Sequence, residues 1–186
     1  MSLTNKLKMG LFAFTLLFIV AMATSVSAES RTNDAQRQVA DRLAEFQRTA
    51  SQLRRQADTL NADRNSRVSW ETHSRHLGNL KDHVNQLGKS LGELEAMKPA
   101  ASENQKLAIE HARPHLVSIA QSTTRALELL KDNRGSIHFP EYGEAASDIY
   151  DHADTLHTKL DAILDFEDAK ARLDELELQP KPSEGS

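Results

Sequence analysis

The chain has 186 residues, with 23 Lys and Arg, 27 Asp and Glu, and a net charge of −4. Such a mildly acidic chain lacks the clustered basic charge of a nucleic-acid binder, so no nucleic-acid partner is expected. The absence of cysteine excludes disulfides, thiolate metal sites, acylation at a cysteine and c-type haem attachment. The core alone must therefore stabilise the fold, and one ordinary domain is expected at this length.

The N-terminus has the three parts of a secretory signal peptide. Lys6 and Lys8 supply positive charge, and an almost wholly apolar run follows over residues 9–23. Val26 and Ala28 then place small residues where a signal peptidase reads them. We predict cleavage after Ala28, a periplasmic or secreted product, and no membrane contact afterwards. The alternative is an uncleaved membrane anchor. This is disfavoured because a spanning helix needs about 20 residues and the apolar run is shorter.

The predicted signal peptide, residues 1–28, contains two lysines and no acidic residue, so its removal changes the net charge to −6. Residues 29–178 are predicted to form a helical bundle domain that is long enough to bury a sizeable core. Residues 179–186, QPKPSEGS, have the polar, proline-containing composition of a disordered tail.

Four segments repeat apolar residues at steps of three and four, which is the spacing of a coiled-coil seam. The seam positions are Val39, Leu43, Phe46, Ala50, Leu53, Ala57 and Leu60; Trp70, His73, Leu77, Leu80, Val84, Leu87, Leu91 and Leu94; Ile109, Ala112, Leu116, Ile119, Thr123, Ala126 and Leu130; and Tyr142, Ala146, Ile149, Ala153, Leu156, Leu160 and Ile163. Short links force neighbouring helices to run antiparallel. The sequence therefore predicts an all-α, up-down-up-down four-helix bundle, and four seams in one chain favour a monomer.

Helix-boundary signals fall between these segments. Ser69 is a predicted N-cap of the second helix, and Pro99 ends that helix. Ser102 and Gln105 have capping-box spacing at the start of the third helix. Gly135 is expected to end it in the left-handed conformation, and Pro140 suits the first turn of the fourth helix.

The C-terminal region keeps a helical period that is out of phase with the fourth seam. Its apolar residues are Phe166, Ala169, Leu173 and Leu176. Either the last helix continues with a local change of winding, or a short fifth helix folds back. Continuation is the favoured interpretation.

Eight histidines are the residues most able to bind a metal or haem. His73 takes a seam position, where it is either a haem axial ligand or a buried core histidine. His111 and His115 lie four residues apart, so they share a helix face, and Pro114 between them predicts a kink or a helix restart. We name His73, His111 and His115 as candidate metal ligands. The chain lacks the Glu-x-x-His motif of di-iron bundles, which disfavours that class of site.

Two further features have competing interpretations. Gly78, Gly88 and Gly92 lie on one predicted helix, and indicate either close approach by another helix or ligand, or a weak solvent-facing stretch. The loop before the fourth helix contains Ile137 and Phe139, and it either carries function, as loops often do, or folds these two residues inward to close the end of the bundle, which is the favoured interpretation.

No motif for nucleophilic catalysis or phosphate binding occurs in the sequence. We therefore predict an exported non-catalytic bundle, not an enzyme, that needs no cofactor and acts as an interaction or structural module with an unknown protein partner. The alternative hypothesis is a periplasmic bundle that binds metal or haem through its histidines. Histidines from different helices within ligand reach would favour that alternative.

Overall fold

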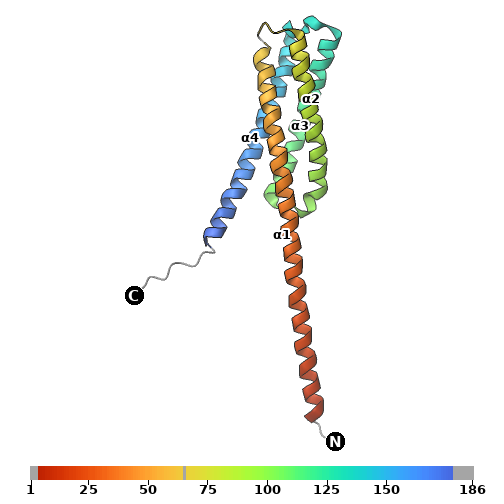
Figure 1. Cartoon of the computed structure of the whole chain (residues 1–186), viewed down its shortest axis with the longest axis vertical. Coiled ribbons are helices and arrows are strands. Elements are labelled where there is room, and N and C mark those ends of the chain that lie inside the picture. The colour runs from red at the N-terminus through yellow and green to blue at the C-terminus, as the bar shows by residue number, and fades with distance from the viewer. Residues whose placement is uncertain (1–3, 65, 178–186) are drawn as a thin grey trace, which may run out of the picture. The chain divides into compact units, whose positions relative to one another are not determined.

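The computed structural model describes the backbone of residues 4–64 and 66–177, and the side chains of residues 33–64, 66–173 and 175–177. Within these residues the chain is helical with no strand, which confirms the all-α prediction (Figure 1). Its elements in order are α1 (Thr4–Asp63), α2 (Trp70–Met97), the 3-10 helix η1 (Lys98–Ala100), α3 (Glu103–Asp132), the 3-10 helix η2 (Arg134–His138) and α4 (Pro140–Glu177).

The chain divides into two compact units, residues 1–38 and residues 39–186. The first unit is the N-terminal part of α1, in which Arg37 lies 3.8 Å from Asp34 on an exposed surface. Among the residues whose side chains are described, no helix is long and apolar enough to cross a membrane. The side chains of the predicted signal peptide and the predicted tail, residues 179–186, lie outside the described residues.

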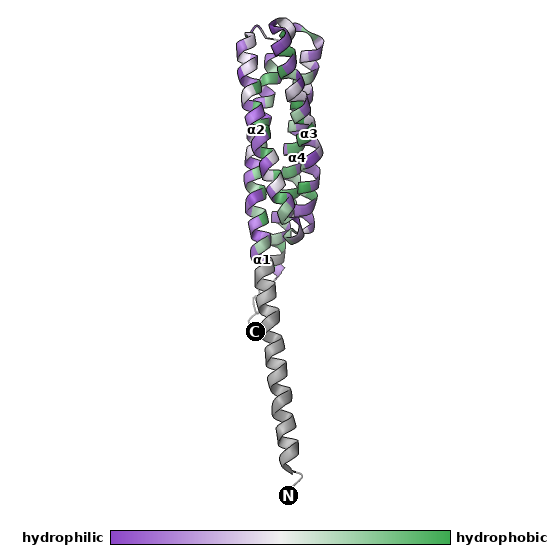
Figure 2. Cartoon of the chain, turned by 90° about the vertical axis from the view of Figure 1, so that its right-hand side faces the viewer, coloured by the Kyte–Doolittle hydropathy of each residue, from purple (hydrophilic) through white to green (hydrophobic). Residues whose placement is uncertain are grey.

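The core of the second unit is built from the four predicted seams. Every seam residue from Val39 to Leu60 is at most 1% exposed, as are Leu80 on α2 and Leu156 on α4. Trp70 and Ile163, at the ends of two seams, are partly buried against the core. Hydrophobic residues gather on the facing sides of the helices, whereas the outer sides are hydrophilic (Figure 2). Burial of these four stripes is the main force that holds the helices together.

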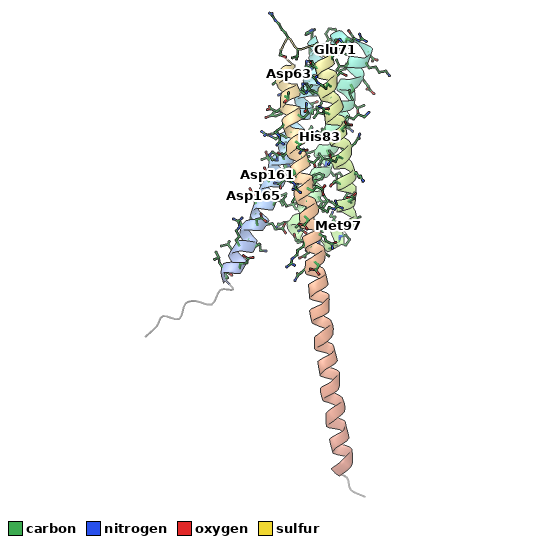
Figure 3. All side chains as sticks on the ribbon, viewed as in Figure 1. Asp63, Glu71, His83, Met97, Asp161 and Asp165 are labelled. Atoms are coloured by element: carbon green, nitrogen blue, oxygen red, sulfur yellow. The ribbon has the colours of Figure 1, made fainter. Side chains whose placement is uncertain are left out.

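Side-chain pairs join neighbouring helices around this core. Gln47 and Arg54 of α1 contact α4, Arg42 of α1 contacts α2, and Lys98 beside α2 contacts α3. The partners are Asp161, Asp154, Glu93 and Glu110, at 2.5, 2.6, 3.9 and 2.5 Å. Asp161 lies part-way along α4 in Figure 3, on the part that faces α1. The two pairs with α4 are part-buried and the other two are exposed, so each remains within reach of solvent and stabilises the fold only slightly.

The helix boundaries follow local signals in the sequence, with one exception. The Ser102 hydroxyl accepts a hydrogen bond from the Gln105 amide, and the Gln105 side chain accepts one from the Ser102 amide, as a capping box requires. Pro140 opens α4 as predicted, and Ser69 is the extended N-cap residue of α2. The prediction for Gly135 is wrong, because no described glycine has a positive φ. Its amide instead donates to the Asn133 side chain, 2.9 Å away, within the turn that starts η2.

Two helices continue where the sequence left alternatives open. The helix α3 passes through Pro114 without a break, so the helix does not restart there. The helix α4 runs to Glu177 as one element, so the favoured continuation is confirmed and no fifth helix forms in the described residues.

The glycines of α2 face open space. A β-carbon added at Gly78, Gly88 or Gly92 would meet no atom within 4 Å. Close approach of another helix is therefore not the reason for these residues, and Gly88 and Gly92 are exposed, as the interpretation as a weak, solvent-facing stretch requires.

Candidate functional site

His73, the first candidate ligand, is a buried core residue that is 1% exposed. Its Nδ1 atom shares a hydrogen bond of 3.0 Å with the hydroxyl of Tyr142, which is fully buried on α4. The two rings meet edge to face, with centroids 5.4 Å apart. Burial lowers the pKa of His73 and raises the pKa of Tyr142, so both side chains are neutral in the core.

A second histidine extends this polar cluster towards the surface. His76 lies with Nε2 at 3.4 Å from Asp63 and with Nδ1 at 2.5 Å from the Gln56 amide nitrogen, so it links α2 to α1. Asp63 lies near the end of α1, at the same end of the bundle as Glu71 (Figure 3). The carboxylate of Asp63 opposes the lowering of the His73 pKa. The cluster is thus a set of mutually satisfied groups that close this end of the bundle.

His111 and His115, the other two candidate ligands, lie half-buried on α3. The nearby carboxylate of Glu110 is held by Lys98 at 2.5 Å, and this contact lowers the Glu110 pKa. His115 instead faces α4, where its Nδ1 atom lies 3.3 Å from Nδ1 of His152. Histidines on two different helices therefore come within ligand reach of a common point.

The three predicted ligands do not form one cluster. His73 contacts Tyr142, while His115 contacts His152. Among the described residues, no group of three or more His, Cys, Asp or Glu side chains could hold a metal ion. His115 and His152 each come one residue before a seam residue, Leu116 and Ala153, and this shared spacing is the signal for the pair in the sequence.

The remaining histidines act separately. His157 on α4 lies with Nε2 at 3.3 Å from Asp161, and its buried Nδ1 atom has no hydrogen-bond partner. His83 is half-buried on α2, near the middle of that helix in Figure 3, and His138 is exposed in η2.

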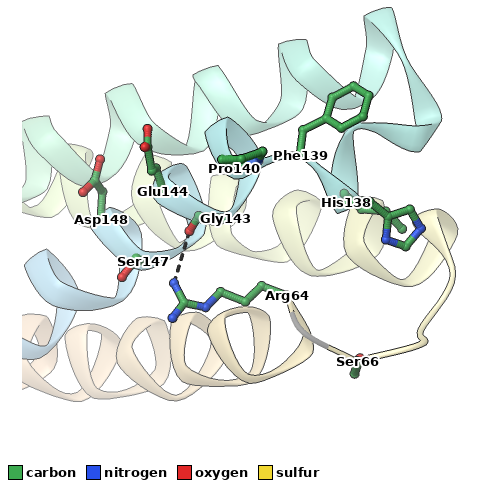
Figure 4. Close-up of a pocket in the computed structure, with 10 residues that line it drawn as sticks. Arg64, Ser66, His138, Phe139, Pro140, Gly143, Glu144, Ser147 and Asp148 are labelled. Atoms are coloured by element: carbon green, nitrogen blue, oxygen red, sulfur yellow. Dashed lines mark hydrogen bonds between the residues drawn. The ribbon is translucent and has the colours of Figure 1, made fainter.

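A recess of about 680 Å³ lies at the loop end of the bundle, between the end of α1 and the start of α4 (Figure 4). The Arg64 side chain crosses it and donates a hydrogen bond of 3.4 Å to the Gly143 carbonyl. Glu144 and Asp148 add negative charge along α4, and Phe139 lies at the other end of the recess. This mixture of opposite charges suits a polar group of a partner better than an apolar ligand.

Phe139 is a correction to the sequence-based expectation. Ile137 is buried, at 8% exposed, as predicted for a residue that closes the bundle. Phe139 is 48% exposed instead of folded inward. The chain passes from a 3-10 turn to an extended residue at Phe139 and then to a helix. No single period spans three such conformations, so spacing does not predict which residue faces the core.

A second recess, of about 500 Å³, lies between η2 and the start of α2. Arg134 stacks on Trp70, with its guanidinium carbon 4.3 Å from the ring centroid. Arg67 and His138 also line this recess. The stacked pair is a cation–π contact that ties η2 to the first residue of α2.

An apolar groove of about 260 Å³ runs between α2 and α3. Val84, Ala120 and Leu127 line it, together with Thr123. The Thr123 hydroxyl is buried and has no hydrogen-bond partner. Lys81 and Lys131 border the groove, which is about as large as a very small ligand.

The C-terminal part of α4 exposes a row of large apolar side chains. Phe166, Leu173 and Leu176 are 62%, 60% and 62% exposed. With Ala169 they follow steps of three and four, so they lie on one face of the helix. We refer to these four residues as the α4 stripe. The shift in phase is visible in the sequence, whereas the exposure of the stripe is seen only in the structure.

No protein-family model matches this chain, and no curated protein or solved structure is significantly similar to it.

Proposed function

We propose that this chain is an exported, non-catalytic helical bundle that binds another protein through the α4 stripe. The observation that carries the proposal is the exposure of Phe166, Leu173 and Leu176 on the C-terminal part of α4, where most of the other residues are charged. Single exposed apolar residues are common, but a row at seam spacing is typical of a helix that packs against a partner.

The C-terminal part of the stripe lies where α4 extends beyond the start of its neighbour α3. The Ser102 hydroxyl, at the N-cap of α3, donates a hydrogen bond of 2.5 Å to Glu167. The helix α4 then continues to Glu177, which adds roughly 15 Å of helix beyond the start of α3. Leu173 and Leu176 therefore have no residue of α3 opposite them.

The stripe by itself is too small to hold two copies of this chain together. Three large side chains at about 60% exposure offer roughly 300–400 Å² of apolar surface. Self-association through the stripe would bury about twice that area, which is less than the roughly 1,200 Å² of a stable interface. We therefore infer a monomer, and a partner protein that packs an apolar helical face on the stripe and also contacts the surface around it.

We also propose that the chain forms an up-down-up-down bundle, and three contacts support this topology. Asp63 at the end of α1 contacts His76 near the start of α2, and Lys98 after α2 contacts Glu110 of α3. Arg125, late in α3, lies 3.6 Å from Glu144 near the start of α4. Each contact joins the end of one helix to the beginning of the next. Links this short favour antiparallel neighbours.

Export is the second part of the proposal. A basic start, an apolar run over residues 9–23 and small residues before Glu29 support cleavage after Ala28 and a periplasmic or secreted product. The intact mass of the protein from its native cell tests this directly. A product that begins at Glu29 supports export, whereas a product that retains the apolar run supports an anchored chain.

A photo-cross-linking experiment tests the stripe. A photoreactive phenylalanine analogue replaces Leu173 in one variant, and Ala171, on the opposite face of the same helix, in the control. We expect a discrete adduct with one other protein at position 173, no adduct at position 171, and loss of the adduct when Leu176→Glu is added. Equal cross-linking from both positions, or no adduct, would overturn the proposal. An adduct of two copies of this chain would show that the stripe serves self-association.

The alternative function, metal or haem binding by histidines, stays a prediction for His73, His111 and His115. The contact of His115 with His152 is the specific observation that favours it. The burial of His73 against Tyr142 favours its interpretation as a core histidine.

A further inference from the structure

We propose that His115 and His152 together bind one divalent transition-metal ion, Cu²⁺ or Zn²⁺, between α3 and α4. This site does not depend on the protein-binding proposal, since the α4 stripe begins 14 residues after His152. It differs from the candidate pair His111 and His115, because its two ligands come from different helices.

The distance between the two nitrogen atoms fits a shared metal ion. The Nδ1 atoms lie 3.3 Å apart, with ring centroids 5.6 Å apart and the rings tilted by 50°. Two imidazole nitrogens on a tetrahedral ion, each bonded at about 2.0–2.1 Å, are separated by about 3.3–3.4 Å. Imidazole is a preferred ligand of both Zn²⁺ and Cu²⁺.

Both imidazoles are accessible from solvent and are fixed in place. Both rings are half-buried, so the site is reachable from solvent and yet held by the two packed helices. Neutral imidazole is the form that binds a metal ion, so protons and the ion compete for the two nitrogens.

The protein supplies two ligands here, and water completes the coordination. His111 is the nearest further imidazole, one helical turn before His115 on α3. Lys159 places a positive charge near the site, which opposes the binding of a cation. The metal-free alternative is a single hydrogen bond between the two imidazoles, which the same distance permits.

Titration of the untagged full chain with Cu²⁺ alone and Zn²⁺ alone, by calorimetry at pH 7.5, tests the proposal. We expect one ion per chain, and a loss of affinity of about tenfold or more in both His115→Gln and His152→Gln. The matched control is His83→Gln, which removes a half-buried histidine on α2 and should leave the affinity unchanged. Lys159→Met should tighten binding, because it removes the nearby positive charge.

Three outcomes would overturn the site. The first is a wild-type chain that binds neither ion more tightly than the His115→Gln variant. The second is unchanged binding in His152→Gln with loss in His111→Gln, which would place the ion on α3 alone. The third, which holds even if a variant fails to fold, is an imidazole ¹⁵N spectrum of the wild-type chain in which Zn²⁺ leaves both His115 and His152 unshifted.

Discussion

The hydroxyl of Tyr142 and Nδ1 of His73 share a buried hydrogen bond of 3.0 Å between α4 and α2. Side-chain pairs join both α2 and α4 to α1 and to α3, so α2 and α4 lie diagonally across the bundle. The hydrogen bond therefore passes through the core and does not join neighbouring helices. Both residues occupy seam positions that an apolar side chain would normally fill. A buried polar pair of this kind stabilises the fold only while both members are present.

Loss of one partner should therefore cost more than loss of both. Tyr142→Phe removes the hydroxyl and keeps the ring, and it leaves the His73 nitrogen buried without a partner. We expect a loss of about 1–3 kcal/mol in the free energy of unfolding, measured by urea denaturation. In a His73→Leu background the same change should cost clearly less. An equal cost in both backgrounds would show that the hydrogen bond does not couple the two residues.

The stability of the bundle should fall as the pH is lowered from 7.5 to 5.5. Burial lowers the pKa of His73 and of His115 in the folded chain, whereas an unfolded histidine takes up a proton near pH 6.5. In this window the unfolded state binds more protons, so the free energy of unfolding decreases as pH falls. Asp63 opposes the shift at His73, while His76 and His138 reinforce it, and Tyr142 stays neutral.

Urea denaturation at the two pH values measures this effect. In His73→Leu the loss of stability between pH 7.5 and 5.5 should be smaller than in the wild-type chain. A variant of the exposed His138, such as His138→Gln, is the control and should retain most of the dependence. An identical pH dependence in the wild-type chain and His73→Leu would contradict the assignment.

Truncation of the core should be costly at seam positions only. Leu80→Ala and Leu156→Ala each remove a side chain that is at most 1% exposed, and we expect a loss of about 2–5 kcal/mol from lost burial and a residual cavity. Leu173→Ala, on the exposed α4 stripe, should change the free energy of unfolding by less than about 0.5 kcal/mol. A neutral result at Leu80 or Leu156 in denaturant melts would mean that the seam is misassigned.

The seams and the capping box could be predicted because both depend on local spacing. A row such as Val39, Leu43 and Phe46 lies on one face of any α-helix, so the apolar face follows from the sequence, and the structure buries that face. The Ser102 and Gln105 pair is equally local, since its hydrogen bonds span three residues.

The contacts between histidines could not be predicted in the same way. His115 and His152 each flank a seam, but whether they meet depends on the rotation and stagger of α3 against α4. Stagger is set by the packing of many side chains at once, not by the residues beside the pair. The same holds for His73 and Tyr142, which lie 69 residues apart in the sequence.

The glycines of α2 offer the last prediction, which is an increase in stability. Gly88 and Gly92 are exposed in the interior of a helix, where a β-carbon would meet no atom within 4 Å. Alanine restricts the unfolded chain and favours the helix, so Gly88→Ala and Gly92→Ala should each stabilise the fold by about 0.5–1 kcal/mol. Gly135→Ala is the control without this gain, because its β-carbon would lie 3.2 Å from the Asn133 side chain in a turn. Thermal and urea unfolding measure all three, and a loss of stability at Gly88 or Gly92 would show that the α2 surface is covered in solution.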